Sequence, residues 1–173
     1  MRPETALKRY RLVLVVFIIG LVLSGVTAFP LMHELELLSS MLGIPADAAP
    51  NSLHGLQFWI ATVRDGLRAT HANFPWLAYG TDWLAFAHII IALFFLGPLR
   101  DPVPNAWVLK IGLVACAGVL PLALICGPIR GIPFYWRLID CSFGLFGCLP
   151  LLYCLRLTEH LRAASPASAS WKQ

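Results

Sequence analysis

Four long apolar stretches dominate this chain and most constrain its fold. They cover about residues 12–32, 83–99, 107–126 and 134–155. A helix needs about 20 predominantly apolar residues to cross a bilayer, and continuous apolar runs argue against the alternating strands of a membrane barrel. Only 13% of the 173 residues are charged, whereas soluble domains carry about 25%. The sequence predicts an all-α membrane protein with four transmembrane helices.

The first apolar stretch has a second interpretation. It follows the basic segment MRPETALKRYR, and VTA at 26–28 resembles a signal-peptidase site. Because apolar residues continue through FPLM, the stretch is long enough to span, which favours a retained helix. Cleavage after residue 28 stays open, and it would leave three spans with an external N-terminus.

The distribution of Lys and Arg favours one orientation. With a cytoplasmic N-terminus, nine of the 13 basic residues fall inside and four outside, which agrees with the positive-inside rule. The inner residues are Arg2, Lys8, Arg9, Arg11, Arg100, Lys110, Arg156, Arg162 and Lys172, and the outer ones are Arg64, Arg68, Arg130 and Arg137. Both termini are therefore predicted to be cytoplasmic. The positive charges flank apolar runs and form no patch for nucleic acid, so the expected partner is the lipid bilayer.

The long connection at 33–81 is then external and predicted to contain an amphipathic helix. Asn51 or Ser52 is the candidate N-cap. Apolar residues follow at helical spacing, with His54, Gln57, Arg64, Asp65 and Arg68 on the opposite face. Packing on the membrane surface or over the bundle is the main expectation. At the other end of the chain, residues 161–173 are small and polar, which predicts a disordered cytoplasmic tail.

With this threading, polar residues gather near the outer boundary of the membrane. Asp82 enters span two, and His88 lies roughly 9 Å deeper at 1.5 Å per residue. Ionisable residues in spans are costly and usually face a partner or a water-filled cavity. The predicted polar site comprises Glu34, Asp82, His88, Arg130, Arg137 and Asp140, with His33 beside it.

Simpler structural roles are open for the same residues. Arg137 and Asp140 are three residues apart and could form an ion pair on one helix face. Asp82 could cap span two, and His88 could bond to a neighbour. The five cysteines, at 116, 126, 141, 148 and 154, lack the spacing of a zinc site and are expected to be small apolar residues. A disulfide between Cys126 and Cys141 is conceivable.

Two segments carry a resemblance. YGTDWLAFAHIIIALFFLGPLRDPVP at 79–104 and GPIRGIPFYWRLIDCSFG at 127–144 resemble segments of uncharacterised small bacterial membrane proteins that cross the membrane several times. Together they make up 44 of the 173 residues. The resemblance implies a bacterial inner-membrane location and supplies neither an activity nor a catalytic residue.

Three functions remain open at this point. The leading hypothesis is a non-catalytic accessory or ligand-binding subunit whose polar site meets a lipid headgroup, a small ligand or another membrane subunit. An outer-leaflet enzyme would use Asp82 or Asp140 as base and His88 as acid or base, with Arg130 and Arg137 holding an anionic substrate. A redox subunit would bind haem b through His33 and His88, or a quinone near them.

Overall fold

The predicted fold class is confirmed in the computed structural model, which describes residues 2–164. Among these residues there are helices and no strands. Four helical segments are long and apolar enough to cross a membrane: Pro3–Ala28, Pro75–Arg100, Ala106–Ile129 and Phe134–Ala163. In the most apolar 18-residue stretch of each segment, taken in the same order, only 11%, 22%, 17% and 17% of the residues are buried inside the protein. Their apolar side chains therefore face outward, as lipid-facing helices require.

The first span ends earlier than expected. Helix α1 (Pro3–Ala28) stops before a turn at Phe29 and Pro30, and a separate helix, α2 (Leu31–Met41), follows. Proline lacks a backbone N–H and fits best in the first turn of a helix, whereas in the interior it removes a hydrogen bond and favours a break. The apolar run at 12–32 thus contains a helix boundary that hydropathy alone does not reveal.

The connection between the first two spans holds two helices instead of one. After α2 come the short turn η1 (Pro50–Ser52) and the amphipathic helix α3 (Gly55–Asn73). The predicted N-cap at Asn51 or Ser52 is wrong, because α3 begins after His54, which caps it without a side-chain hydrogen bond. The Ser52 hydroxyl donates to the Ala49 carbonyl at 2.7 Å, so it serves the preceding turn.

The second span is built from three consecutive pieces. They are η2 (Pro75–Ala78), α4 (Tyr79–Phe94) and α5 (Leu96–Arg100). Asp82 lies in the first turn of α4 and not at its N-cap, so that prediction is also wrong. An acidic side chain in a first turn still interacts favourably with the positive end of the helix dipole.

The two prolines within the later spans have different consequences. Helix α6 (Ala106–Pro121) widens after Pro121 into the π-helical segment η3 (Leu122–Cys126), which leads into α7 (Gly127–Ile129). By contrast, α8 (Phe134–Ala163) runs without interruption through Pro150. Beyond the end of α8, the part of the predicted tail at 165–173 lies outside the described residues.

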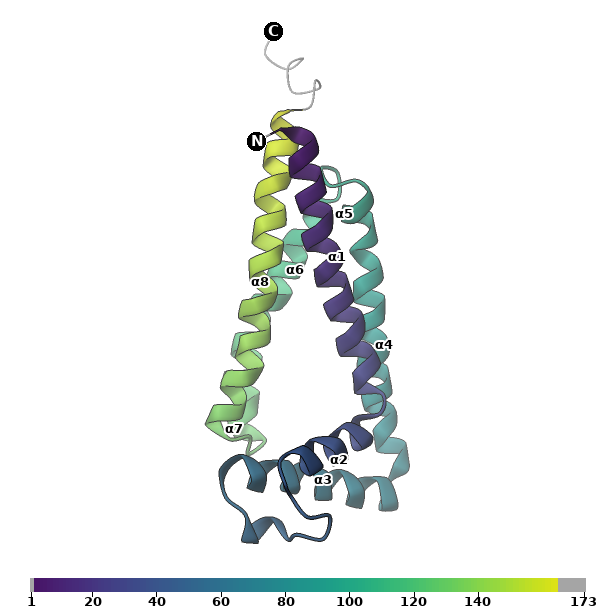
Figure 1. The fold of residues 1–173 in the computed structure, drawn as a ribbon, viewed down its shortest axis with the longest axis vertical. Helices are drawn as coiled ribbons and strands as arrows, with labels where there is room; N and C mark the ends of the chain where they lie inside the picture. Colours follow the sequence, from purple (N-terminus) through teal and green to yellow (C-terminus); the bar gives the residue numbers. More distant parts are fainter. Residues whose placement is uncertain (1, 165–173) are drawn as a thin grey trace. The chain divides into compact units, whose positions relative to one another are not determined.

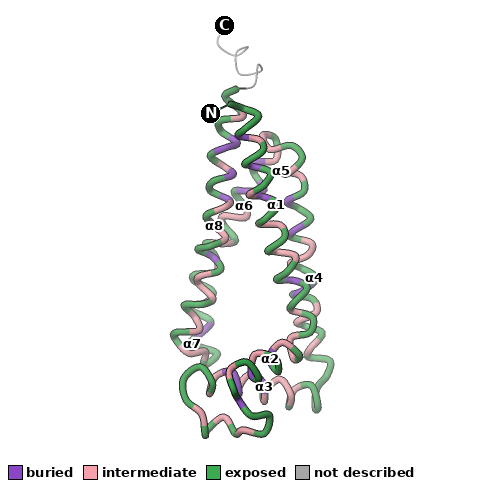
Figure 2. Tube along the Cα trace, in the orientation of Figure 1, coloured by how far each residue is buried: buried purple, intermediate pink, exposed green. Residues whose placement is uncertain are grey.

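The chain divides into two compact units, and the first combines residues 2–20 with 91–164. In this unit the beginning of α1 lies beside the end of α8 (Figure 1). The Tyr10 hydroxyl, fully buried, donates to the Pro98 carbonyl at 3.1 Å. The Cys154 thiol donates to the Tyr10 carbonyl at 3.7 Å. These bonds connect three spans through buried residues. Figure 2 colours the buried parts of the chain purple.

The second unit comprises residues 21–90. The end of α1 contacts α4 here at Gly25, where an added Cβ atom would lie 2.9 Å from the Ala85 carbonyl oxygen and 3.0 Å from Cβ of His88. Only a glycine allows this close approach of two helices. The remainder of the unit is the connection formed by α2, η1 and α3.

Candidate functional site

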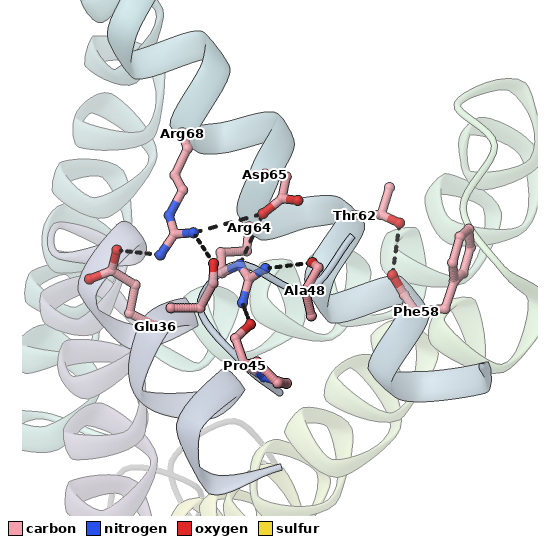
Figure 3. A network of polar contacts seen from close by, with 9 residues as sticks. Glu36, Pro45, Ala48, Phe58, Thr62, Arg64, Asp65 and Arg68 are labelled. Carbon is pink, nitrogen blue, oxygen red and sulfur yellow. Dashed lines mark hydrogen bonds and ion pairs between the residues drawn. The ribbon is translucent and has the colours of Figure 1, made fainter. Parts of the chain in front are cut away.

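The most buried charged side chain belongs to α3. Arg64 is 1% exposed, and its Nε donates to Oδ1 of Asp65 at 3.0 Å. Nη1 donates to the Pro45 carbonyl at 3.1 Å and Nη2 to the Ala48 carbonyl at 3.4 Å. A buried guanidinium needs such partners. One arginine therefore holds the loop between α2 and α3 against α3 (Figure 3).

Arg68, one helical turn later, extends this network to α2. Its Nη1 donates to the Ala46 carbonyl at 3.0 Å and lies 3.9 Å from Oδ1 of Asp65. Its Nη2 donates to Oε1 of Glu36 at 3.1 Å. The side chains of Arg68 and Glu36, which Figure 3 shows in contact, are 37% and 46% exposed, so this end of the network is open to solvent.

A cavity of about 490 Å³ lies beside the two arginines. Glu36 and Ser39 of α2 line it together with Ile44 of the loop and both guanidinium groups. Ser39 is 3% exposed, and its hydroxyl has no hydrogen-bond partner. Small-molecule sites have volumes of about 300–1,000 Å³ with a few placed polar groups, and a buried hydroxyl without a partner is unusual. The size and the donors of this cavity suit a small polar ligand.

The predicted site residues are divided between the two compact units. Glu34, Asp82 and His88 belong to residues 21–90, whereas Arg130, Arg137 and Asp140 belong to the unit formed by 2–20 and 91–164. Their convergence stays a prediction. None of the six lines the cavity beside Arg64 and Arg68.

His88 bonds within its own helix. Its Nδ1 lies 2.8 Å from the Leu84 carbonyl oxygen. Because a carbonyl only accepts, Nδ1 carries the hydrogen, and the neutral ring then has its lone pair on Nε2. His33, the other histidine considered for haem, is exposed on α2.

The predicted ion pair between Arg137 and Asp140 is absent. In residues 2–164 the ion pairs within 4.0 Å are those of Arg64 and Arg68 with Asp65 and Glu36. The Arg137 guanidinium carbon instead lies 5.2 Å from the centroid of the Phe134 ring. The side chain thus turns toward the start of α8 and away from Asp140. All five cysteines are free thiols, including Cys126 and Cys141.

Sequence reasoning assigned Arg64 and Arg68 to a polar helix face and missed their contacts with α2 and the loop. The spacing of Arg64, Asp65 and Arg68 in RDGLR was a usable indication, because residues four apart share a helix face. Nothing in the sequence indicated Ser39, whose burial depends on how α2 and the loop fold together.

In the described part of the chain, no three His, Cys, Asp or Glu side chains lie together in an arrangement that could hold a metal ion. Comparison of the sequence with protein-family models and with curated proteins, and of the fold with solved structures, finds no match.

Proposed function

We propose that this multi-pass membrane protein is a non-catalytic ligand-binding or accessory subunit, and that it binds a small polar ligand in the cavity between α2 and α3. The observation that carries this proposal is Ser39, which lines a cavity of about 490 Å³ and whose buried hydroxyl has no hydrogen-bond partner. Leaving such a group unsatisfied costs about 1–3 kcal/mol. Rotation of the Ser39 side chain toward the cavity would let a ligand hydrogen bond offset this cost.

The charged side chains of the cavity indicate which charged and hydrogen-bonding groups the ligand has. An arginine has five N–H donors, of which Arg64 directs three and Arg68 two toward protein acceptors. Donors therefore remain for an acidic ligand group, and the second oxygen of Glu36 can accept a hydrogen bond. A small molecule with one acidic group and one hydrogen-bond donor, such as an amino acid or a hydroxy acid, fits both requirements.

The test is thermal unfolding of the purified protein with amino acids, hydroxy acids and sugar phosphates added separately. Bound ligand raises the melting temperature because it stabilises only the folded state. We expect one of these three classes of compound to raise the melting temperature of the native protein. The same class should leave the melting temperatures of Ser39→Ala and Arg68→Gln unchanged. Ser24→Ala is the matched control, since Ser24 is exposed on α1 in the same unit. An equal response of Ser39→Ala and the native protein would contradict the proposal.

Haem b is the second candidate, and the His88 hydrogen bond favours it. Metal-binding histidines usually donate their other ring N–H to a carbonyl or carboxylate, as Nδ1 of His88 does toward Leu84. Nε2 is then the nitrogen available to iron. The test is the absorption spectrum of protein from haem-replete cells, before and after dithionite. A Soret band that shifts on reduction and is lost in His88→Ala supports haem, and a featureless spectrum excludes it.

The inner-membrane location and the cytoplasmic termini belong to the same proposal. The beginning of α1 and the end of α8 lie on one side of the unit that contains them (Figure 1), as an even number of spans requires. Labelling of intact cells with a membrane-impermeant thiol reagent tests the orientation, with single cysteines introduced at Arg2 and at Ser52 in a variant whose five native cysteines are replaced by serine or alanine. The proposal requires that the reagent added outside the cells does not label the cysteine at position 2 and does label the cysteine at position 52.

A further inference from the structure

Arg137 is the charged side chain that the proposed ligand cavity leaves unexplained. It lies in the first turn of α8, half-buried, and no carboxylate of the described residues is within 4.0 Å of it. Its Nε is buried without a hydrogen-bond partner. A charge-bearing group that lacks both an ion pair and a hydrogen bond is costly in a membrane protein. The guanidinium therefore has donors left for a partner other than the protein's own side chains.

The side chain is held in place by its surroundings. A Cβ atom at Gly127 would lie 2.7 Å from Cγ of Arg137 and closer still to Cδ, so the aliphatic stem packs directly on the α7 backbone. The guanidinium carbon is 5.2 Å from the Phe134 ring centroid, a cation–π distance. An arginine fixed at both its stem and its head loses little further entropy on binding an anion.

The position of Arg137 along α8 indicates which anion is near. The helix has 30 residues, or about 45 Å at 1.5 Å per residue, which exceeds a hydrocarbon core of about 30 Å. Residues 138–155 contain Asp140 and no basic side chain, and Arg137 and Arg156 flank them. These 18 residues rise about 27 Å. Arg137 therefore lies at the edge of the hydrocarbon, at the depth of lipid phosphates.

A second cation accompanies it. Arg130 follows α7 directly, is exposed, and has no ion pair within the described residues. The stem of Arg137 contacts Gly127 at the other end of that short helix. Two unneutralised arginines on adjoining turns give this end of the unit a local positive charge, with Asp140 as its nearest acidic residue along α8.

We infer that Arg137, assisted by Arg130, binds the headgroup phosphate of an anionic phospholipid such as phosphatidylglycerol. The planar guanidinium suits two phosphate oxygens, and the acyl chains would lie along the apolar surface of α8, where Leu145 and Leu152, within about 80° of Arg137 around the helix, are 61% and 44% exposed. This site is separate from the ligand cavity of the other unit. Its failure would leave the proposed function untouched.

The test is native mass spectrometry of the detergent-purified protein with equal amounts of phosphatidylglycerol and phosphatidylcholine. One arginine near an anionic lipid contributes about 1 kcal/mol, so we expect phosphatidylglycerol adducts to exceed phosphatidylcholine adducts about five-fold. Arg137→Gln should abolish the preference. Arg156→Gln is the matched control, because it removes the same charge from the opposite end of the same apolar run and should retain the preference.

Three outcomes would overturn the inference. They are a native protein without preference, an Arg137→Gln variant with unchanged preference, and displacement of the adduct by excess glycerol phosphate, which would assign the site to a free phosphate. If Arg137→Gln does not fold, as judged by circular dichroism, Gly127→Ala replaces it. That variant keeps the charge of Arg137 but displaces its stem. The ratio of phosphatidylglycerol to phosphatidylcholine adducts should then fall toward one.

Discussion

Nη2 of Arg68 lies 3.1 Å from Oε1 of Glu36, and this contact joins α3 to α2 across 32 residues of sequence. Both side chains are more than one-third exposed, and exposed ion pairs contribute about 0–1 kcal/mol. We therefore expect Glu36→Gln and Arg68→Gln each to lower the free energy of unfolding by less than about 1 kcal/mol. A double-mutant cycle measures the coupling, which should shrink in high salt. Coupling that persists at 1 M salt would contradict this expectation.

Arg64 should matter far more than Arg68, although the two are one turn apart. Arg64→Met removes the charged donor of the part-buried hydrogen bonds to the Pro45 and Ala48 carbonyls, and a hydrogen bond to a charged group contributes about 1.5–3 kcal/mol. We expect a loss of about 3 kcal/mol, measured as faster amide hydrogen exchange in the 42–49 loop and α3. Arg162→Met, an exposed site in the other unit, is the control. Unchanged exchange after Arg64→Met would show that the loop holds without it.

These two arginines also show where sequence reasoning ended. Helical periodicity assigns both to one polar face, yet Arg64 is 1% exposed because the loop at 43–49 folds over it. Burial here results from contacts 16 and 19 residues apart in sequence, which a local pattern does not encode.

The four spans were predictable for the opposite reason. Continuous apolar stretches report directly on transfer into lipid, whatever the helices later contact.

Helix ends illustrate the same limit. Hydropathy located the first span but did not separate α1 from α2, because both sides of Pro30 are apolar. For Arg137 and Asp140, spacing permitted an ion pair, and the structure instead directs the arginine toward Phe134 and Gly127. Spacing on a helix states which side chains can meet, whereas packing against a neighbouring helix decides which do.

The buried hydrogen bond of Tyr10 is a test of the unit formed by residues 2–20 and 91–164. Tyr10→Phe removes only the hydroxyl that donates to the Pro98 carbonyl and leaves that carbonyl without the donor. We expect a loss of about 1–2 kcal/mol, measured by unfolding in mixed detergent micelles. Tyr153→Phe makes the same chemical change at a side chain that is 38% exposed and should have little effect. Equal losses in both variants would contradict a specific role for this bond.

The packing of α6 on α8 gives a sharper comparison, since two glycines undergo the same substitution in opposite surroundings. A Cβ atom at Gly144 would lie 2.5 Å from the Cys116 carbonyl oxygen, which belongs to backbone and cannot rotate away. Gly144→Ala should therefore push the helices apart and destabilise the unit by about 1–3 kcal/mol.

At Gly118 an added Cβ meets nothing within 4 Å, and alanine in a helix interior is favoured over glycine by about 0.5–1 kcal/mol. Gly118→Ala should thus be neutral or stabilising in the same unfolding experiment. Opposite signs for the two variants would locate the close contact at Gly144, whereas equal effects would mean that α6 and α8 do not approach each other there.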